Sequence, residues 1–211
     1  MSQTANINQL FKTAHDDGTL SAKSMQALNI ADPGAQIQAG LGVDVSDVSA
    51  SEVVLVTIMP DDSGSINSGN NAQIVRDGHN EVLRALKASK QQDGILSHTR
   101  YLNGKVLHPY CALNQAVEMD VNNYNPNEGT PLYDQTVVLL GTVLAKSQEF
   151  SDNGVPVRTV SLIITDGADM HSTKSRPADV KSIVSDMLKQ ETHIVAAMGI
   201  ADGSTDFRKV F

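Results

Sequence analysis

The segment from Val53 to Ser65, with the sequence VVLVTIMPDDSGS, decides the fold of this chain. Its first half is an apolar run that is interrupted at Thr57, and such runs are typical of strands buried on both faces of a parallel sheet. Pro60 ends the run, and acidic and hydroxyl residues follow directly. The sequence therefore predicts a central strand with a polar loop at its carboxyl end, which is where open α/β sheets bind ligands.

Helices and strands alternate along the chain after this segment. Residues 72–86 carry apolar side chains at intervals of three and four, which predicts a helix with one buried face. Asn103-Gly104 separates two strand-like runs and predicts a hairpin. Further expected elements are a buried helix from Thr130-Pro131, a strand over 159–164, a helix from Pro177 and a strand over 193–200. We predict an α/β fold: a doubly wound, mainly parallel sheet with one antiparallel edge hairpin and helices on both faces.

Residues 1–50 have a different pattern from the rest of the chain. Short stretches with helical spacing lie around Leu10 and Met25, and residues 35–50 show no clear period. We predict a helical and irregular N-terminal extension over 1–50, which packs on a main domain over 51–211.

Composition and charge narrow the classes of partner. The net charge is −8, from 16 basic and 24 acidic residues, and no basic cluster stands out. This disfavours nucleic acid and anionic membranes as partners. Cys111 is the single cysteine, the first ten residues are polar, and no apolar run has the length of a membrane span. We expect a cytoplasmic protein.

Three polar segments adjoin apolar elements of the predicted fold. They are Asp61-Asp62-Ser63-Gly64-Ser65, Gly129-Thr130-Pro131 and Thr165-Asp166-Gly167. Their carboxylates and hydroxyls are all oxygen donors, which suit a hard cation such as Mg²⁺ or Mn²⁺. The proposed metal residues are Asp61, Ser63, Ser65, Thr130 and Asp166. Each segment alone also fits a plain turn, and Thr130 alone fits a helix N-cap.

The order of these segments resembles the von Willebrand factor A (vWA) domain and its metal-ion-dependent adhesion site. The resemblance covers roughly residues 52–203 and includes the edge hairpin. The sequences around Thr130 and Asp166 look like those of intracellular bacterial members of the family.

This resemblance implies a role for each residue. Ser63 and Ser65 would coordinate the ion through their hydroxyls, and Thr130 would do so directly or through water. Asp61 and Asp166 would act mainly through waters bound to the ion, or would accept hydrogen bonds from the groups that coordinate it. Candidates for the rim of the site are Asp62, Gly129, Gly167 and Asp169.

The function that follows is a metal-dependent protein-interaction module rather than an enzyme, in which a partner's Asp or Glu completes the octahedron around the ion. Related cytoplasmic proteins suggest an AAA+ ATPase, a kinase or a phosphatase as partner. Two alternatives remain open: a metal-dependent hydrolase or phosphotransferase on a similar sheet, and a scaffold subunit with a structural metal.

The family pattern also continues beyond the end of this sequence. The chain stops at Phe211, inside what the pattern predicts to be another helix, whereas the family has that helix and a final edge strand. We expect a truncated chain, completion by another chain, or filling of the gap by residues 1–50, with an edge or face left exposed.

Overall fold

The structure, a computed structural model, describes residues 7–30, 34–200 and 206. Its sheet has the strand order β3-β2-β1-β4-β5, and every neighbouring pair is parallel except the antiparallel pair β2 and β3. The strands are β1 (Val53–Pro60), β2 (Ile95–Arg100), β3 (Val106–Ala112), β4 (Val157–Thr165) and β5 (His193–Gly199). The apolar run that begins at Val53 is thus the central strand β1.

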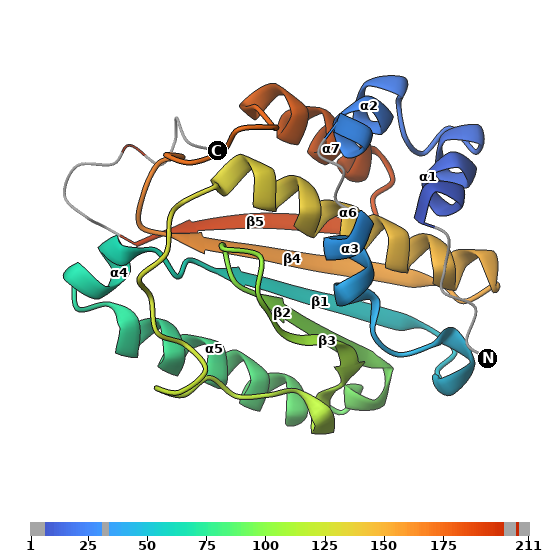
Figure 1. Cartoon of the computed structure of the whole chain (residues 1–211). Coiled ribbons are helices and arrows are strands. Elements are labelled where there is room, and N and C mark those ends of the chain that lie inside the picture. The colour runs from blue at the N-terminus through green and yellow to red at the C-terminus, as the bar shows by residue number, and fades with distance from the viewer. Residues whose placement is uncertain (1–6, 31–33, 201–205, 207–211) are drawn as a thin grey trace.

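Helices cover both faces of the sheet (Figure 1). Helix α5 packs on one face, and α6 and α7 pack on the other together with the N-terminal helices. The helices are α1 (Ile7–Asp16), α2 (Ala22–Ile30), α3 (Gly34–Leu41), α4 (Gly64–Ser68), α5 (Ala72–Lys87), α6 (Leu132–Asp152) and α7 (Pro177–Lys189). Short 3₁₀ turns are η1 (Val45–Asp47), η2 (Gln92–Gly94) and η3 (Leu113–Gln115). The predicted fold class is confirmed.

Two local expectations differ from the structure. Helix α6 begins at Leu132 with Pro131 at the cap position, one residue later than predicted, so Thr130 is not its N-cap. The amide of Thr130 instead bonds to a neighbouring loop, which holds the residue outside the helix. Residues 35–50, which show no period, contain most of α3 and also η1. Contacts with α6 and β3, rather than a local pattern, define α3.

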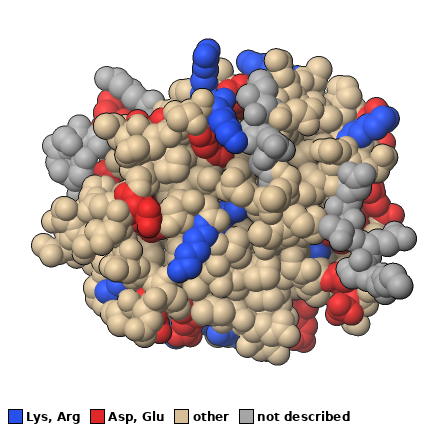
Figure 2. Space-filling model, viewed as in Figure 1, with Lys and Arg blue, Asp and Glu red and all other residues tan. Residues whose placement is uncertain are grey.

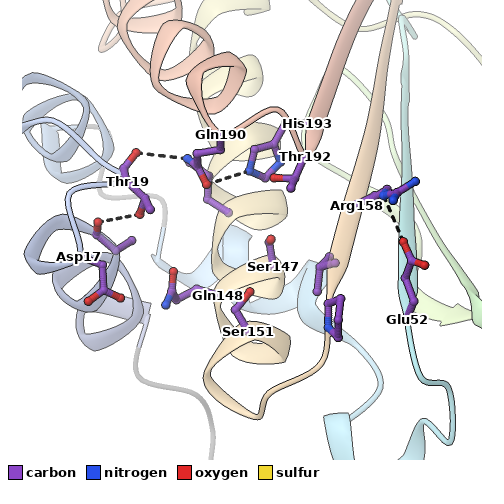
Figure 3. Close-up of a pocket in the computed structure, with 14 residues that line it drawn as sticks. Asp17, Thr19, Glu52, Ser147, Gln148, Ser151, Arg158, Gln190, Thr192 and His193 are labelled. Carbon is purple, nitrogen blue, oxygen red and sulfur yellow. Dashed lines mark hydrogen bonds and ion pairs between the residues drawn. The ribbon is translucent and has the colours of Figure 1, made fainter.

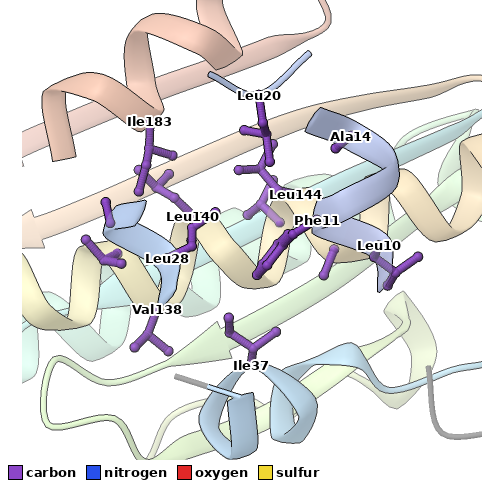
Figure 4. Packing of buried hydrophobic residues seen from close by; sticks show 14 of the residues in the cluster. Leu10, Phe11, Ala14, Leu20, Leu28, Ile37, Val138, Leu140, Leu144 and Ile183 are labelled. Atoms are coloured by element: carbon purple, nitrogen blue, oxygen red, sulfur yellow. The ribbon is translucent and has the colours of Figure 1, made fainter. Parts of the chain in front are cut away.

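The N-terminal helices share one apolar core with α6 and α7 (Figure 4). Phe11, Leu28 and Ile37 are each at most 3% exposed and pack on this core. Each such side chain contributes about 2 kcal/mol by leaving water. Polar contacts add to this, since Asp186 of α7 accepts bonds from Ser21 N at 2.8 Å and Ser24 Oγ at 2.6 Å. The division of the chain at residue 50 stays a prediction.

Strand β2 carries an unusually polar part of the core. Its residues Ser97, His98, Thr99 and Arg100 are all fully buried. The Arg100 guanidinium donates to Thr142 Oγ1 at 3.2 Å and, through Nη2, to the carbonyls of Gln36 and Gly104 at 3.3 Å. This one side chain therefore ties α3, α6 and the hairpin turn together.

The outer part of the sheet face that carries α5 remains exposed at β5, where Ile194 is 60% and Met198 is 52% exposed. The expected helix at the end of the chain falls on residues 201–211, where the structure describes Asp206 alone, so it lies outside the described residues. Within the described part of the chain, no helix is long and apolar enough to cross a membrane.

Candidate metal site

The first and third polar segments meet at the carboxyl edge of the sheet. Strands β1 and β4 are parallel neighbours, and Pro60 pairs with Ile164 at their ends. The backbone continues this contact, because Asp61 N donates to Ile164 O at 2.8 Å. Asp61 and Asp166 therefore leave the sheet side by side, as expected for adjacent parallel strands.

Asp61 is fully buried and shapes the loop that follows it. Its Oδ1 accepts the N–H of Ser63 at 2.7 Å, and its Oδ2 accepts the hydroxyl of Thr165 at 2.5 Å. A carboxylate that bonds to the backbone two residues ahead is the usual way for Asp to stabilise a tight turn. Asp61 thus joins both segments and orients the serines beyond it.

A chain of hydrogen bonds links two serines to the second carboxylate. The hydroxyls of Ser63 and Ser65 lie 2.9 Å apart, and Ser65 Oγ donates to Asp166 Oδ1 at 2.7 Å. Ser63 and Asp166 are buried at 2% and 3% exposure, whereas Ser65 is exposed. The oxygens therefore lie at the surface end of a buried polar cluster.

The first segment contacts Glu128, which lies two residues before Thr130. Glu128 forms a parallel bridge with Ser63, accepts the N–H of Gly64 at 3.1 Å, and donates its own N–H to Asp62 O at 3.0 Å. Thr130 itself is 7% exposed and bonds to Met170 and His171 in the loop after Asp166, and the hydrogen-bonded chain of Ser63, Ser65 and Asp166 does not include it. The structure thus brings all three predicted segments together.

Asp62, a predicted rim residue, turns toward the hairpin. It is 4% exposed, and its Oδ1 accepts the N–H of Asn103 at 3.0 Å. Burial, with a smaller contribution from the nearby Asp61, raises the pKa of Asp62 to about 7. Its contact ties the end of β1 to the turn between β2 and β3.

The other rim candidates belong to the loop contacts around α6. Gly129 lies against the ring of His171, and Gly167 donates its N–H to Thr165 Oγ1 at 3.2 Å. Asp169 accepts the N–H of Tyr133 at 3.3 Å, in the first turn of α6. These residues surround the cluster and support its backbone.

Some supporting residues were not predicted from the sequence. Tyr124 donates its hydroxyl to the carbonyl of Asp61 from the loop between η3 and α6, and Glu128 bridges to Ser63 from the same loop. That loop has no periodicity from which its path could be inferred. Thr165, which donates its hydroxyl to Asp61, belongs to the third predicted segment, although the sequence assigned no role to it.

The donor set can be tested against a bound cation. Adjacent oxygens around an octahedral Mg²⁺ lie about 2.9 Å apart, because each Mg–O distance is about 2.1 Å. The hydroxyl oxygens of Ser63 and Ser65, the two proposed direct ligands, lie 2.9 Å apart, which is also the length of an ordinary hydrogen bond between hydroxyls. Among the described residues, no three His, Cys, Asp or Glu side chains come together as a metal site, so an ion here would depend on the serine hydroxyls. The spacing of the two serine hydroxyls is compatible with adjacent ligands of Mg²⁺ or Mn²⁺.

A cavity of about 720 Å³ lies at the opposite edge of the sheet, where the strands begin (Figure 3). Neutral side chains such as Ser147, Gln148 and Thr192 line it, together with the ion pair of Arg158 and Glu52 at 3.1 Å. His193 bonds to Thr159 at 2.8 Å, and burial lowers its pKa to about 4. We place the candidate site at the Asp61 edge, because the carboxylates and hydroxyls converge there.

Comparisons with known proteins do not assign a family. No family model matches the chain, and no curated protein matches it either. The resemblance to vWA domains therefore rests on the three segments, and the fold is consistent with a broader Rossmann-like class.

Proposed function

We propose that this chain is a vWA-like protein-interaction module that depends on Mg²⁺ or Mn²⁺. The observation that carries the proposal is the line of oxygens from Ser63 through Ser65 to Asp166, with spacings of 2.9 and 2.7 Å. Ser63 and Ser65 would hold the ion directly, and Thr130 would do so directly or through water. Asp61 and Asp166 would accept hydrogen bonds from the ligands around it.

The ligand that this site would capture is a carboxylate of a partner protein. Hydroxyl ligands bring no charge, so a bound divalent ion keeps its Lewis acidity toward an incoming Asp or Glu. The exposure of Ser65 supports access from outside. The chain's own part is to hold the hydroxyls in place, which Asp61 does through Ser63 N and Thr165 Oγ1.

We propose binding rather than catalysis for this site. Both oxygens of Asp61 already accept hydrogen bonds that shape the loop, and Asp62 bonds to the hairpin. The carboxylates of Asp61 and Asp62 thus have structural contacts, and either one would have to give them up to act as a general base. Turnover of a phosphoester that is lost in an Asp61→Asn variant would revive the hydrolase alternative.

The proposed partner is a protein with an exposed acidic residue, such as an AAA+ ATPase, a kinase or a phosphatase. Nucleic acid and membranes are not proposed, given the net charge of −8. On the face seen in Figure 2, basic side chains are scattered among acidic ones. We infer a cytoplasmic location, which the buried free thiol of Cys111 supports.

Calorimetry with Mg²⁺ and Mn²⁺ tests the metal. The chain should bind one ion, and the Asp166→Ala variant should bind none while keeping its fold by circular dichroism.

Titration of acetate into the Mn²⁺-loaded chain then tests whether the bound ion captures a carboxylate. Water-proton relaxation should fall as acetate displaces bound water, and unchanged relaxation would count against carboxylate capture. Strong metal binding with a large rise in Tm and no carboxylate effect would favour the scaffold alternative.

A further inference from the structure

We propose that His171 is a positioning residue that fixes Thr130 relative to Asp166, so that these two parts of the site move as one unit. The inference rests on the proposed function for its effect on metal affinity. Thr130 N donates to His171 Nδ1 at 2.8 Å. In return, the N–H groups of Met170 and His171 donate to Thr130 O at 3.1 and 3.2 Å. Both backbone polar groups of Thr130 are thus held by the loop that follows Asp166.

Gly129 gives independent support for this contact. A Cβ atom at position 129 would lie 3.0 Å from His171 Nδ1 and 3.1 Å from Cγ, closer than ordinary van der Waals contact. The imidazole therefore lies directly against the backbone before Thr130. Glycine at this position permits the approach, although the His171 side chain is exposed.

The same loop also caps helix α6. Asp169 Oδ1 accepts the N–H of Tyr133 at 3.3 Å and the hydroxyl of Ser172 at 2.5 Å, and Ser172 Oγ accepts the N–H of Asp134 at 3.0 Å. The first N–H groups of a helix have no partner inside it, so side chains that accept them stabilise its start. The loop from Asp166 therefore fixes where α6 begins, directly after Thr130.

Asp134 ties the helix to the loop in the other direction. Its carboxylate accepts the N–H groups of Thr173 at 2.9 Å, Lys174 at 3.1 Å and Ser175 at 2.6 Å. Hydrogen bonds to an ionised acceptor are about twice as strong as neutral ones. Side chains of the loop thus accept N–H groups of the helix, and Asp134 of the helix accepts N–H groups of the loop. His171 extends this connection to Thr130.

Amide hydrogen exchange at Thr130, measured by NMR on the metal-free chain, tests the positioning directly. His171→Ala removes the acceptor and should speed exchange at this amide roughly tenfold. His171→Asn, whose amide oxygen can replace Nδ1, should restore most of the protection. Met170→Ala is the matched control, because Met170 lies in the same loop and is 75% exposed. It should leave the Thr130 amide unchanged.

Calorimetry with Mg²⁺ on the same variants tests the consequence. His171→Ala should weaken affinity roughly tenfold, as loss of a supporting residue behind a ligand does, and His171→Asn should recover it to within about twofold. Unchanged Thr130 exchange in His171→Ala, or equal effects of His171→Ala and Met170→Ala, would overturn the inference. Absence of Mg²⁺ binding by the unmodified chain would defeat the proposed function, and the exchange data would still decide the role of His171.

Discussion

Two buried polar clusters in this molecule differ in their charge and in their access to solvent. The core cluster on β2, Ser97 to Arg100, is sealed on both faces and fully buried. The site cluster of Asp61, Ser63, Ser65 and Asp166 is buried at one end and reaches solvent at Ser65. In the core cluster, His98 Nε2 and Arg100 Nε have no hydrogen-bond partner among the described residues.

The two clusters differ in whether their hydrogen bonds could be replaced by bonds to a ligand without disturbing the fold. Arg100 donates to backbone carbonyls that cannot move without unpacking α3 or the hairpin turn. Ser63 and Ser65 bond to each other, and these hydroxyls could exchange that bond for a bond to an ion without disturbing the sheet. Burial of polar residues alone therefore does not mark a binding site. What distinguishes the candidate site is a set of hydroxyl oxygens that bond to each other within reach of solvent.

Arg100→Ala should give the largest change in stability and leave the site intact. The substitution removes the donor to the Gln36 and Gly104 carbonyls and leaves a cavity. We expect a loss of about 3 kcal/mol in the free energy of unfolding, measured with urea. Arg100→Met fills much of the volume and relieves the buried charge, so it should lose about 1 kcal/mol. A change of more than about twofold in the Mg²⁺ affinity of either variant would contradict the separation of the clusters.

The histidine of β3 that adjoins the core cluster should make stability depend on pH. Burial, with smaller effects of His79 and Lys87, lowers the pKa of His108 to about 4, whereas the unfolded chain protonates near pH 6.5. The unfolded chain therefore binds more protons below about pH 6.5. The contribution of His108 to stability is complete above that pH and falls by about 2 kcal/mol from pH 7 to pH 5.

A matched variant isolates this effect. Asp62 acts in the opposite direction, because burial raises its pKa to about 7 and the folded state gains protons as the pH falls. The informative quantity is thus the difference between the chain and His108→Asn, measured by urea unfolding at pH 7, 6 and 5. That difference should change by about 2 kcal/mol across the range. If the free energies of unfolding of the unmodified chain and of His108→Asn changed equally with pH, His108 would not be held neutral in the folded state.

The sequence predicted the sheet better than the contacts around the site. Apolar runs such as Val53–Pro60 are long and bounded by proline or by Asp-Gly, so strand and helix types could be inferred from them. The convergence of Asp61 and Asp166 followed from parallel strand ends. The roles of Tyr124 and His171 could not be inferred, because their contacts join segments that are distant in sequence and irregular in structure.

Asp61→Asn should have an intermediate effect on stability, because this carboxylate accepts two bonds at the end of β1. An amide has one oxygen to accept, so either Ser63 N or the Thr165 hydroxyl loses its acceptor. We expect a loss of about 1.5 kcal/mol in the free energy of unfolding and loss of Mg²⁺ binding. Thermal unfolding with and without Mg²⁺ measures both, and a Mg²⁺-dependent rise in Tm that survives in the variant would contradict the role of Asp61.

Ser63→Ala should have the smallest effect on stability and a decisive effect on the metal. Ser63 and Ser161 form a matched pair of buried serines, since Ser63 is 2% exposed just beyond β1 and Ser161 is 0% exposed in the middle of β4. The Ser63 hydroxyl bonds to Ser65 in the site cluster, whereas Ser161 Oγ has no hydrogen-bond partner within the described part of the chain. Ser63→Ala should change stability by less than about 0.5 kcal/mol and abolish Mg²⁺ binding in calorimetry. Ser161→Ala should stabilise by about 0.5–1 kcal/mol, because it removes an unpaired buried hydroxyl, and should bind Mg²⁺ as the unmodified chain does. Equal Mg²⁺ binding by the two variants would mean that the hydroxyls of the site cluster are as purely structural as those of the core.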